Sequence, residues 1–144
     1  MERSRSQELT SLRVAWDAWR ATRGGPDAIP SRQAARLDAL VRHARLASRF
    51  YADHYREVPP GPIGPEAFYR LPPVTKPELT ARFDDWVTDP SVTRAGVERF
   101  VANLDNLGRD FLDRYLVITT SGSTGVSALL VQDPRAVAVM IGLA

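Results

Sequence analysis

The spacing of apolar residues predicts two helices in the first third of the chain. In residues 6–22, leucine and tryptophan recur every three or four positions with charged residues between them, as in an amphipathic helix. Gly24-Gly25-Pro26 ends this segment. A longer helix is predicted from an N-cap at Ser31 to about Tyr55. Its apolar face comprises Leu37, Leu40, Val41, Ala44, Tyr51 and Tyr55.

Two shorter helices are predicted after a proline-rich connector. Residues 59–65 contain four prolines and two glycines, which predicts an extended segment laid over the helical layer. Thr75 and Glu78 have the spacing of a capping box and begin a helix that continues through Trp86. Thr93 caps the next helix, which Gly108 ends. The apolar stripe of that helix comprises Val97, Phe100, Val101 and Leu104.

The pattern changes from helix to strand near the C-terminus. Apolar, β-branched runs at both ends of the stretch Tyr115–Val131 predict two strands around a polar loop. Asp133-Pro134 then begins a helix that is apolar almost all round. A two-stranded hairpin alone is marginally stable, and an apolar helix needs cover that the other predicted elements do not supply. We therefore expect the front part of a larger domain.

The predicted fold class is α/β, with an α+β character in this stretch. A mainly helical region is expected over residues 1–110, followed by the start of a nucleotide-binding α/β core over residues 111–144. The proposed phosphate-binding loop occupies residues 119–127 of this second region.

Composition excludes several classes of function. The 144 residues are 44% hydrophobic and 25% charged, which is typical of a globular domain, and the absence of cysteine excludes disulfides and thiolate sites. Basic residues are interleaved with acidic ones, so no nucleic-acid partner is predicted. No apolar run approaches the roughly 20 residues that span a bilayer, and no signal peptide is evident. We expect no membrane contact and a cytoplasmic location.

Two pairs of residues with ring side chains are candidates for ligand sites. Trp16 and Trp19 lie on one helical stripe, where core or interface packing is favoured over ligand binding. His43 and His54 are eleven residues apart, which is about 16 Å along one straight helix. They therefore cannot share a metal, solvated or capping roles are expected for both, and no metal ligand is predicted.

The chemistry of the chain is concentrated in the loop Thr120–Gly125. Its six residues carry no bulk and no charge, and four of them carry a hydroxyl: Thr120, Ser121, Ser123 and Thr124. Gly122 and Gly125 allow backbone N–H groups to approach an anion closely. The stretch lacks the lysine of a Walker A loop, the third glycine of a dinucleotide loop and the spacing of a nucleophile elbow. The strands that flank it also disfavour the helix-flanked G-x-x-G loop of KH domains.

The loop resembles the phosphate-binding loop of adenylate-forming enzymes, the acyl-CoA synthetase and ligase superfamily. That signature is T-S-G-[ST]-T-G between two strands, and Thr120–Gly125 matches all six positions. The upstream chain resembles the phenylacetate–coenzyme A ligase branch, in the helical stretch from Leu40 to Tyr51 and in Leu71–Leu79, which follows a Leu-Pro-x-x-Thr-Lys-x-x-Leu pattern. The resemblance covers roughly residues 35–140, and only the loop motif is specific.

This resemblance implies an ATP-dependent ligase. The loop would hold the β- and γ-phosphates of ATP with Mg²⁺ while a carboxylic acid attacks the α-phosphorus, and the acyl group would then pass to a thiol, commonly coenzyme A. Two positions depart from the pattern: Ser127 replaces proline and Ala128 replaces lysine. The later motifs of the family cannot be located, so no catalytic residue is assigned. The chain alone is expected to be inactive in pyrophosphate exchange.

A second hypothesis belongs to a different class. The chain could be a helical interaction module without catalysis, in which the Ser/Gly loop is incidental and the Trp16/Trp19 face is the contact surface. Self-association into a homodimer is compatible with both hypotheses, because an apolar hairpin edge and an uncovered helix favour it.

Overall fold

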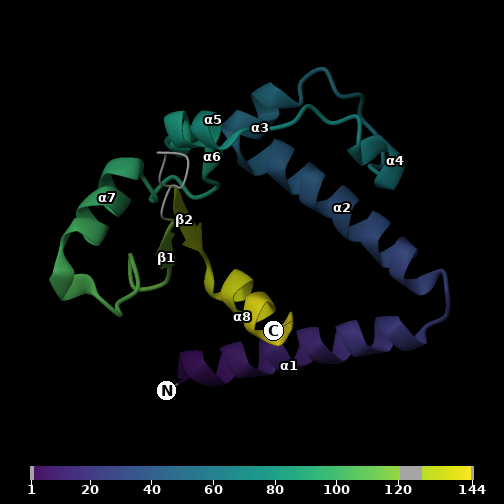
Figure 1. The fold of residues 1–144 in the computed structure, drawn as a ribbon, viewed down its shortest axis with the longest axis horizontal. Coiled ribbons are helices and arrows are strands. Elements are labelled where there is room, and N and C mark those ends of the chain that lie inside the picture. The colour runs from purple at the N-terminus through teal and green to yellow at the C-terminus, as the bar shows by residue number, and fades with distance from the viewer. Residues whose placement is uncertain (1, 121–127, 144) are drawn as a thin grey trace. The chain divides into compact units, whose positions relative to one another are not determined.

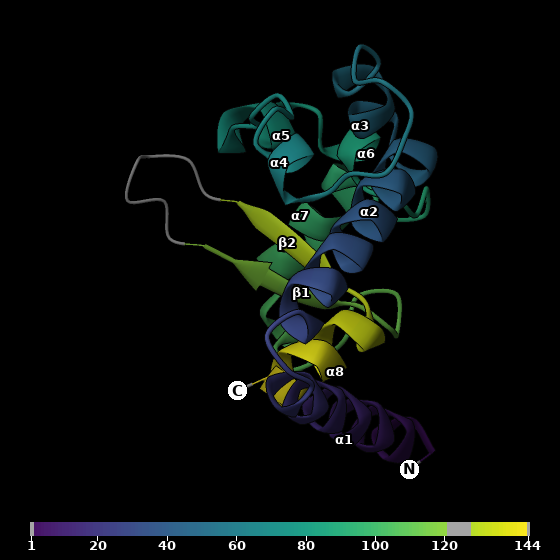
Figure 2. The same cartoon turned by 90° about the vertical axis from the view of Figure 1, so that its right-hand side faces the viewer.

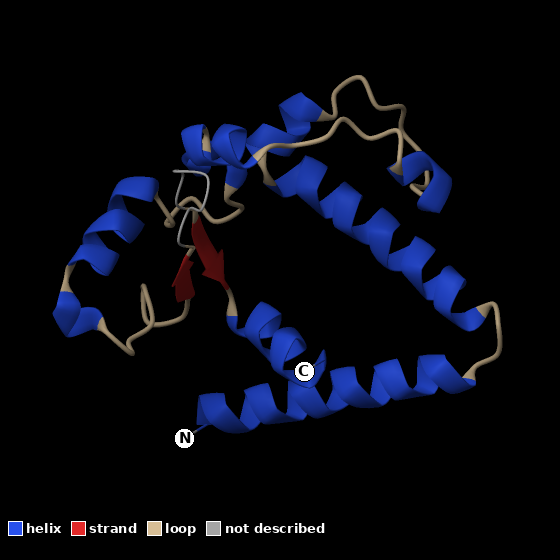
Figure 3. Cartoon of the chain, viewed as in Figure 1, coloured by secondary structure: helices blue, strands red, loops and turns tan. Residues whose placement is uncertain are grey.

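The computed structural model describes residues 2–120 and 128–143 (Figure 1). The described chain is mainly helical and contains one two-stranded antiparallel sheet, so the α+β character predicted for this stretch is confirmed (Figure 3). Contacts group the chain into two compact units. The first combines the described residues of 1–25 and 97–144, and the second comprises residues 26–96.

In the first unit, the first and last helices pack against each other. Helix α8 (Pro134–Leu143) begins as predicted, because the Ala136 N–H donates to Oδ1 of Asp133 at 2.6 Å. It lies against α1 (Glu2–Arg23) in both views of Figures 1 and 2. The hydroxyl of Ser11 in α1 donates to the carbonyl oxygen of Ala138 in α8 at 3.0 Å, and Ala138 is buried.

The two helices approach each other closely where α8 has a glycine. A Cβ atom at Gly142 would lie only 2.6 Å from the carbonyl oxygen of Ser11 and 3.1 Å from Cβ of Val14. The expectation that nothing covers the last helix is therefore wrong on this side, since α1 covers it. The other side of α8 still exposes large apolar side chains: Met140, Ile141 and Leu143.

The sheet of the first unit consists of two four-residue strands. Strand β1 (Leu116–Thr119) pairs antiparallel with β2 (Leu129–Gln132), with Leu116 opposite Gln132 and Thr119 opposite Leu129. A tight turn leads into β1, in which the N–H and C=O groups of Phe111 and Tyr115 are hydrogen-bonded to each other. The two strands predicted from the sequence are thus present in the described residues.

Helix α7 (Arg94–Ala102) begins as predicted but ends early. The Gly96 N–H donates to Oγ1 of Thr93 at 3.2 Å, which confirms Thr93 as the cap. After Ala102 the chain turns into the short 3₁₀ helix η1 (Leu104–Asn106), whose start is capped by the side chain of Asn103. Leu104 is therefore 84% exposed, and its predicted place on the buried stripe is wrong.

In the second unit, the long helix predicted between Ser31 and Tyr55 is two helices. Helix α2 (Ala28–Ala47) starts before Ser31, and α3 (Arg49–His54) follows after a break at Ser48. Ser48 has an extended backbone, and its side chain accepts a hydrogen bond from the Tyr51 N–H, so it caps the second helix. Ser48 is only 2% exposed, and its hydroxyl donates to the carbonyl oxygen of Asp85 at 3.1 Å.

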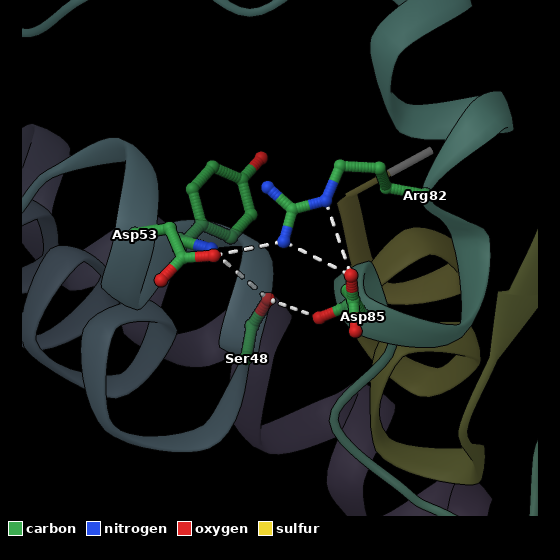
Figure 4. A network of polar contacts seen from close by, with 5 residues as sticks. Ser48, Asp53, Arg82 and Asp85 are labelled. Carbon is green, nitrogen blue, oxygen red and sulfur yellow. Dashed lines mark hydrogen bonds and ion pairs between the residues drawn. The ribbon is translucent and has the colours of Figure 1, made fainter.

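The predicted helix from Thr75 to Trp86 is also interrupted. Helix α5 (Lys76–Ala81) begins with the predicted capping box, and α6 (Phe83–Trp86) follows after a kink at Arg82. The guanidinium of Arg82 bridges the carboxylates of Asp53 in α3 and Asp85 in α6, at 2.8 and 2.9 Å (Figure 4). These hydrogen bonds, first to Asp53 and then to Asp85, raise the pKa of the Arg82 side chain. The kink directs the Arg82 side chain towards α3. Arg82 therefore links α3 to α6 through its two ion pairs.

The proline-rich segment packs on α2, as the sequence indicated. The Ile63 N–H donates to a carboxylate oxygen of Asp38 in α2, and Arg45 donates to the carbonyl oxygen of Val58. The segment contains a short helix that was not predicted, α4 (Pro65–Phe68). The core beneath it is formed by buried Val41, Tyr55 and Ile63, packed against Leu37, Tyr51, Val58, Ala67 and Leu71.

The capping box makes the stability of the second unit dependent on pH. The hydroxyl and N–H of Thr75 both donate to the carboxylate of Glu78, which lowers the pKa of that carboxyl. A lowered folded-state pKa contributes stability above the unfolded-state value of about 4.3, and this contribution is lost as pH falls through the folded-state pKa.

We therefore expect Glu78→Gln to destabilise the protein at pH 6 and to matter progressively less as the pH falls towards 3. Urea unfolding of the native chain and the variant at several pH values measures this difference. Glu66→Gln removes the same charge from the exposed first turn of α4 and serves as control. The variant and the native chain differ in their free energy of unfolding. If this difference stayed constant across the pH range, the lowered pKa of Glu78 would be contradicted.

Candidate functional site

The predicted phosphate-binding loop connects β1 to β2, and hydrogen bonds hold the two strands together at its base. Beyond the last pair of the β1–β2 ladder, the Thr120 N–H donates to the carbonyl oxygen of Ala128, and the Ala128 N–H donates to Oγ1 of Thr120, both at 3.0 Å. The Thr120 side chain is thus folded across the stem of the loop. Figure 2 shows the two strands running side by side towards this stem. The strand context on both sides, on which the interpretation of the motif depended, is confirmed.

Only the first residue of the six-residue motif belongs to the described part of the chain. Thr120 lies at the end of β1, where its hydroxyl stabilises the stem. The other five predicted phosphate-binding residues lie outside the described residues: Ser121, Gly122, Ser123, Thr124 and Gly125. Their role as donors to phosphate stays a prediction from the sequence.

The register of the sheet fixes the direction of the main-chain groups next to the loop. In an antiparallel pair, hydrogen-bonded positions alternate with positions whose N–H and C=O groups point to the other side. Because Thr120 is bonded to Ala128, the groups of Val117 and Thr119 point away from β2. Within residues 2–120 and 128–143 no strand pairs with this open side of β1, so it presents main-chain donors and acceptors directly beside the stem.

A groove of about 290 Å³ adjoins this open side, and the sequence did not indicate it. It combines apolar side chains from α7, η1 and β1 with polar ones from the connecting turns. Its lining includes Phe100, Val101, Leu104, Leu107, Leu116 and Val117, together with Asn103, Asn106, Arg109, Asp110 and Thr119. No sequence signal pointed to this groove, because the apolar pattern placed Leu104 on the stripe of a helix ending at Gly108, whereas Leu104 and Leu107 are exposed in the structure.

A second, more open hollow of about 460 Å³ lies next to the first and shares several of its walls. Arg109 and Asp110 line both, and Leu112 and Asp113 complete the second hollow. Leu112 and Asp113 both have positive φ values, 52° and 56°, which is an uncommon conformation for residues with side chains. Arg109 brings to this region a guanidinium, the group that best matches the geometry of phosphate or carboxylate.

His43 is exposed, in agreement with its predicted solvated role, whereas His54 has a different role. Nε2 of His54 lies 3.2 Å from the carbonyl oxygens of both Pro72 and Pro73, and its ring stacks on Phe50. His54 therefore holds the chain before α5 in place, and the expected solvated or capping role is wrong. Trp16 and Trp19 stack on each other and are exposed, so they do not lie in the core, and the predicted packing in an interface stays a prediction.

Neither a metal-binding cluster nor a membrane-spanning helix is present in the described ranges 2–120 and 128–143. No group of three or more histidine, aspartate or glutamate side chains there is arranged to hold a metal ion. None of the helices in these ranges combines the length and the apolar character required to cross a bilayer.

Comparison with known proteins adds no family assignment. A scan against protein-family models finds no match, and searches of curated proteins and of solved structures find no significant similarity.

Proposed function

We propose that this chain carries the ATP phosphate-binding segment of an adenylate-forming acyl- or aryl-CoA ligase. The loop Thr120–Gly125 would bind the β- and γ-phosphates, and residues 111–144 would form the start of the nucleotide-binding core. In the complete reaction a carboxylic acid is adenylated at the expense of ATP with Mg²⁺, and coenzyme A is the thiol that accepts the acyl group. The phosphate-binding step is the part of this reaction that we propose for the residues of this chain.

The observation that carries the proposal is the stem of the loop. A loop of small hydroxyl and glycine residues is held at its base by a pair of hydrogen bonds between Thr120 and Ala128, at the end of two paired strands. Fixed ends reduce the conformational freedom that a phosphate-binding loop loses when it closes on its ligand. Catalysis of phosphoryl chemistry depends mainly on such positioned donors.

The groove beside the stem supports the same proposal. Ala128 replaces the lysine that many members of the superfamily have after the loop, so a cation must come from elsewhere. Arg109 lines the groove together with Thr119, the residue that precedes the motif. We propose Arg109 as a source of positive charge for the bound phosphates.

The experiment is a titration of the chain with a fluorescent ATP analogue in the presence of Mg²⁺, followed by fluorescence anisotropy. Thr124→Val removes one hydroxyl from the motif and keeps its size. Because a hydrogen bond to a charged group contributes about 1.5–3 kcal/mol, we expect affinity to fall about 10- to 100-fold. Arg109→Gln is expected to weaken binding less, since its side chain is exposed.

Matched controls separate the motif from general effects on the fold. Ser91→Ala removes an exposed hydroxyl from the second unit, and Gly64→Ala adds a methyl group where nothing lies within 4 Å. Both should bind the analogue as the native chain does. Equal affinity of Thr124→Val and the native chain would contradict the proposal, as would the absence of any binding by the native chain.

A second candidate function is a helical interaction module, and one observation favours it. The tryptophan face of α1, which this hypothesis requires as contact surface, is exposed and organised. In this second function the Ser/Gly loop is incidental and the chain has no affinity for nucleotides, so the titration with the ATP analogue distinguishes the two candidates.

A further inference from the structure

The two residues at the base of the loop depart from a regular antiparallel pair. In a regular hydrogen-bonded pair, each residue donates its N–H to the carbonyl oxygen of the other. Here the Thr120 N–H donates to the carbonyl oxygen of Ala128 at 3.0 Å, as in a regular pair. The Ala128 N–H, however, donates to Oγ1 of Thr120, also at 3.0 Å. A side-chain oxygen therefore takes the place of the main-chain carbonyl oxygen of Thr120.

This exchange of acceptors ends the ladder between the strands at Thr120. Thr119 lies opposite Leu129, so Thr120 and Ala128 form the next pair in the register. Because the Ala128 N–H is bonded to the Thr120 side chain, it does not hold the peptide group that follows Thr120 in the plane of the sheet. The chain is therefore released from the sheet at the position where the residues predicted to bind phosphate begin.

The chemistry of this contact restricts the residue at position 120. A hydroxyl on Cβ can accept a hydrogen bond from a nearby main-chain N–H, and serine and threonine carry such a group. Valine has the shape of threonine but no acceptor. Branching at Cβ restricts the rotation of the threonine side chain, which favours a single position of Oγ1. The hydrogen bond is partly buried, so water competes with it less than at an exposed site.

The preceding threonine is placed differently, although it is of the same residue type. Thr119 is exposed and lines the groove beside β1, and its main-chain groups point away from β2. Of these two consecutive residues, Thr120 is the one whose hydroxyl joins the two strands. The position of Thr120 in the ladder, and not its residue type alone, therefore determines its role.

We propose that Thr120 is a positioning residue of the phosphate-binding loop. By accepting the Ala128 N–H, its hydroxyl ends the ladder at this pair and fixes the point from which the donors of residues 121–125 approach the ligand. Its effect on binding is exerted through Ala128, whereas the sequence predicted Thr120 itself as a phosphate donor. This inference rests on the proposed function, because it concerns how the same loop is held.

The first experiment tests the contact itself, without nucleotide. Nuclear magnetic resonance detects a main-chain hydrogen bond as a small coupling between the amide nitrogen of the donor and the carbonyl carbon of the acceptor. In the native chain we expect this coupling between the Thr120 nitrogen and the Ala128 carbonyl, and none in the reverse direction. A coupling between the Ala128 nitrogen and the Thr120 carbonyl would overturn the proposal.

The second experiment measures binding of the fluorescent ATP analogue in a double-mutant cycle. Thr120→Val removes the acceptor, and lactic acid incorporated at position 128 replaces the Ala128 N–H by an ester oxygen and removes the donor. One hydrogen bond is lost in each case, so each change should weaken binding about three- to ten-fold. The chain with both changes should bind no more weakly than either alone, because both act through one contact. Thr120→Ser keeps the acceptor and should restore binding to within about two-fold of the native chain.

A matched control and the pattern of effects separate the positioning role from the proposed function. Thr88→Val removes the hydroxyl of an exposed threonine within residues 26–96 and should bind the analogue as the native chain does. Circular dichroism confirms that each variant keeps its helical content. If the two changes weakened binding independently of each other, the hydroxyl would contact the phosphates directly, and the positioning role alone would be refuted. Absence of binding by the native chain would refute the proposed function and the positioning role with it.

Discussion

Gly142→Ala is expected to destabilise the packing of α1 on α8 by about 2 kcal/mol. In an isolated helix the same substitution is stabilising by about 1 kcal/mol, because alanine has the higher helix propensity. The expectation has the opposite sign because a Cβ atom at this position would lie 2.6 Å from the carbonyl oxygen of Ser11. That oxygen belongs to the backbone of α1, so the overlap is relieved only if one helix moves away from the other.

Urea unfolding gives the change in stability, and hydrogen exchange localises it. We expect faster exchange in α1 and α8 and unchanged exchange in residues 26–96, which form the other unit. Gly64→Ala is the matched control, because no atom lies within 4 Å of the position of its added Cβ. If Gly142→Ala stabilised the chain, the close approach of the two helices would be refuted.

The parts of the fold that could be predicted from the sequence are those determined by residues a few positions apart. The caps at Thr75, Thr93 and Asp133 are of this kind, since donor and acceptor lie within three residues of each other. The two strands were predicted for the same reason, because alternation and β-branching are local properties.

The breaks within predicted helices depend on contacts between distant residues. Ser48 interrupts a sequence with a continuous helical pattern, and its hydroxyl donates to Asp85, 37 residues away. Arg82 similarly reaches Asp53, 29 residues away. Apolar periodicity does not reveal such partners, so the predicted helices were too long.

The orientation of α1 illustrates a second limit. Hydrophobicity favours burial of the tryptophan stripe, whereas α8 packs on the side that has Ser11 and Val14. Small residues allow two backbones to approach closely, as Gly142 does from the other helix. The choice between the two faces depends on the shape of the partner, which a single helix sequence does not contain.

The strand context of the candidate site could be predicted from the sequence, but the surroundings of the site could not. The motif Thr120–Gly125 and its strand context follow from the sequence. The hydrogen bond from Ala128 to the Thr120 hydroxyl and the groove next to β1 do not. The lining of this groove comes from three segments that are brought together only in the folded chain, so no local pattern indicates Arg109 as a member of the site.

Ser48→Ala is expected to cost about 2 kcal/mol, which is unusually large for the loss of one hydroxyl. The reason is that the hydroxyl acts in two places. It accepts a hydrogen bond from the Tyr51 N–H at the start of α3, and it donates one to the carbonyl oxygen of Asp85 in α6. Loss of a cap costs about 1 kcal/mol, and a partly buried carbonyl left without its donor adds a similar amount.

The contrast with neighbouring polar groups makes this prediction specific. Ser91 also has a hydroxyl that is hydrogen-bonded, to Asp89, but it is exposed, so water replaces the lost bond in Ser91→Ala. Arg82→Gln removes the ion pairs with Asp53 and Asp85, whose side chains are likewise accessible to water, and we expect it to cost less than Ser48→Ala. Urea unfolding of the three variants ranks them. If Arg82→Gln proved the most damaging, the ion pairs rather than the buried hydroxyl would hold α3 and α6 together.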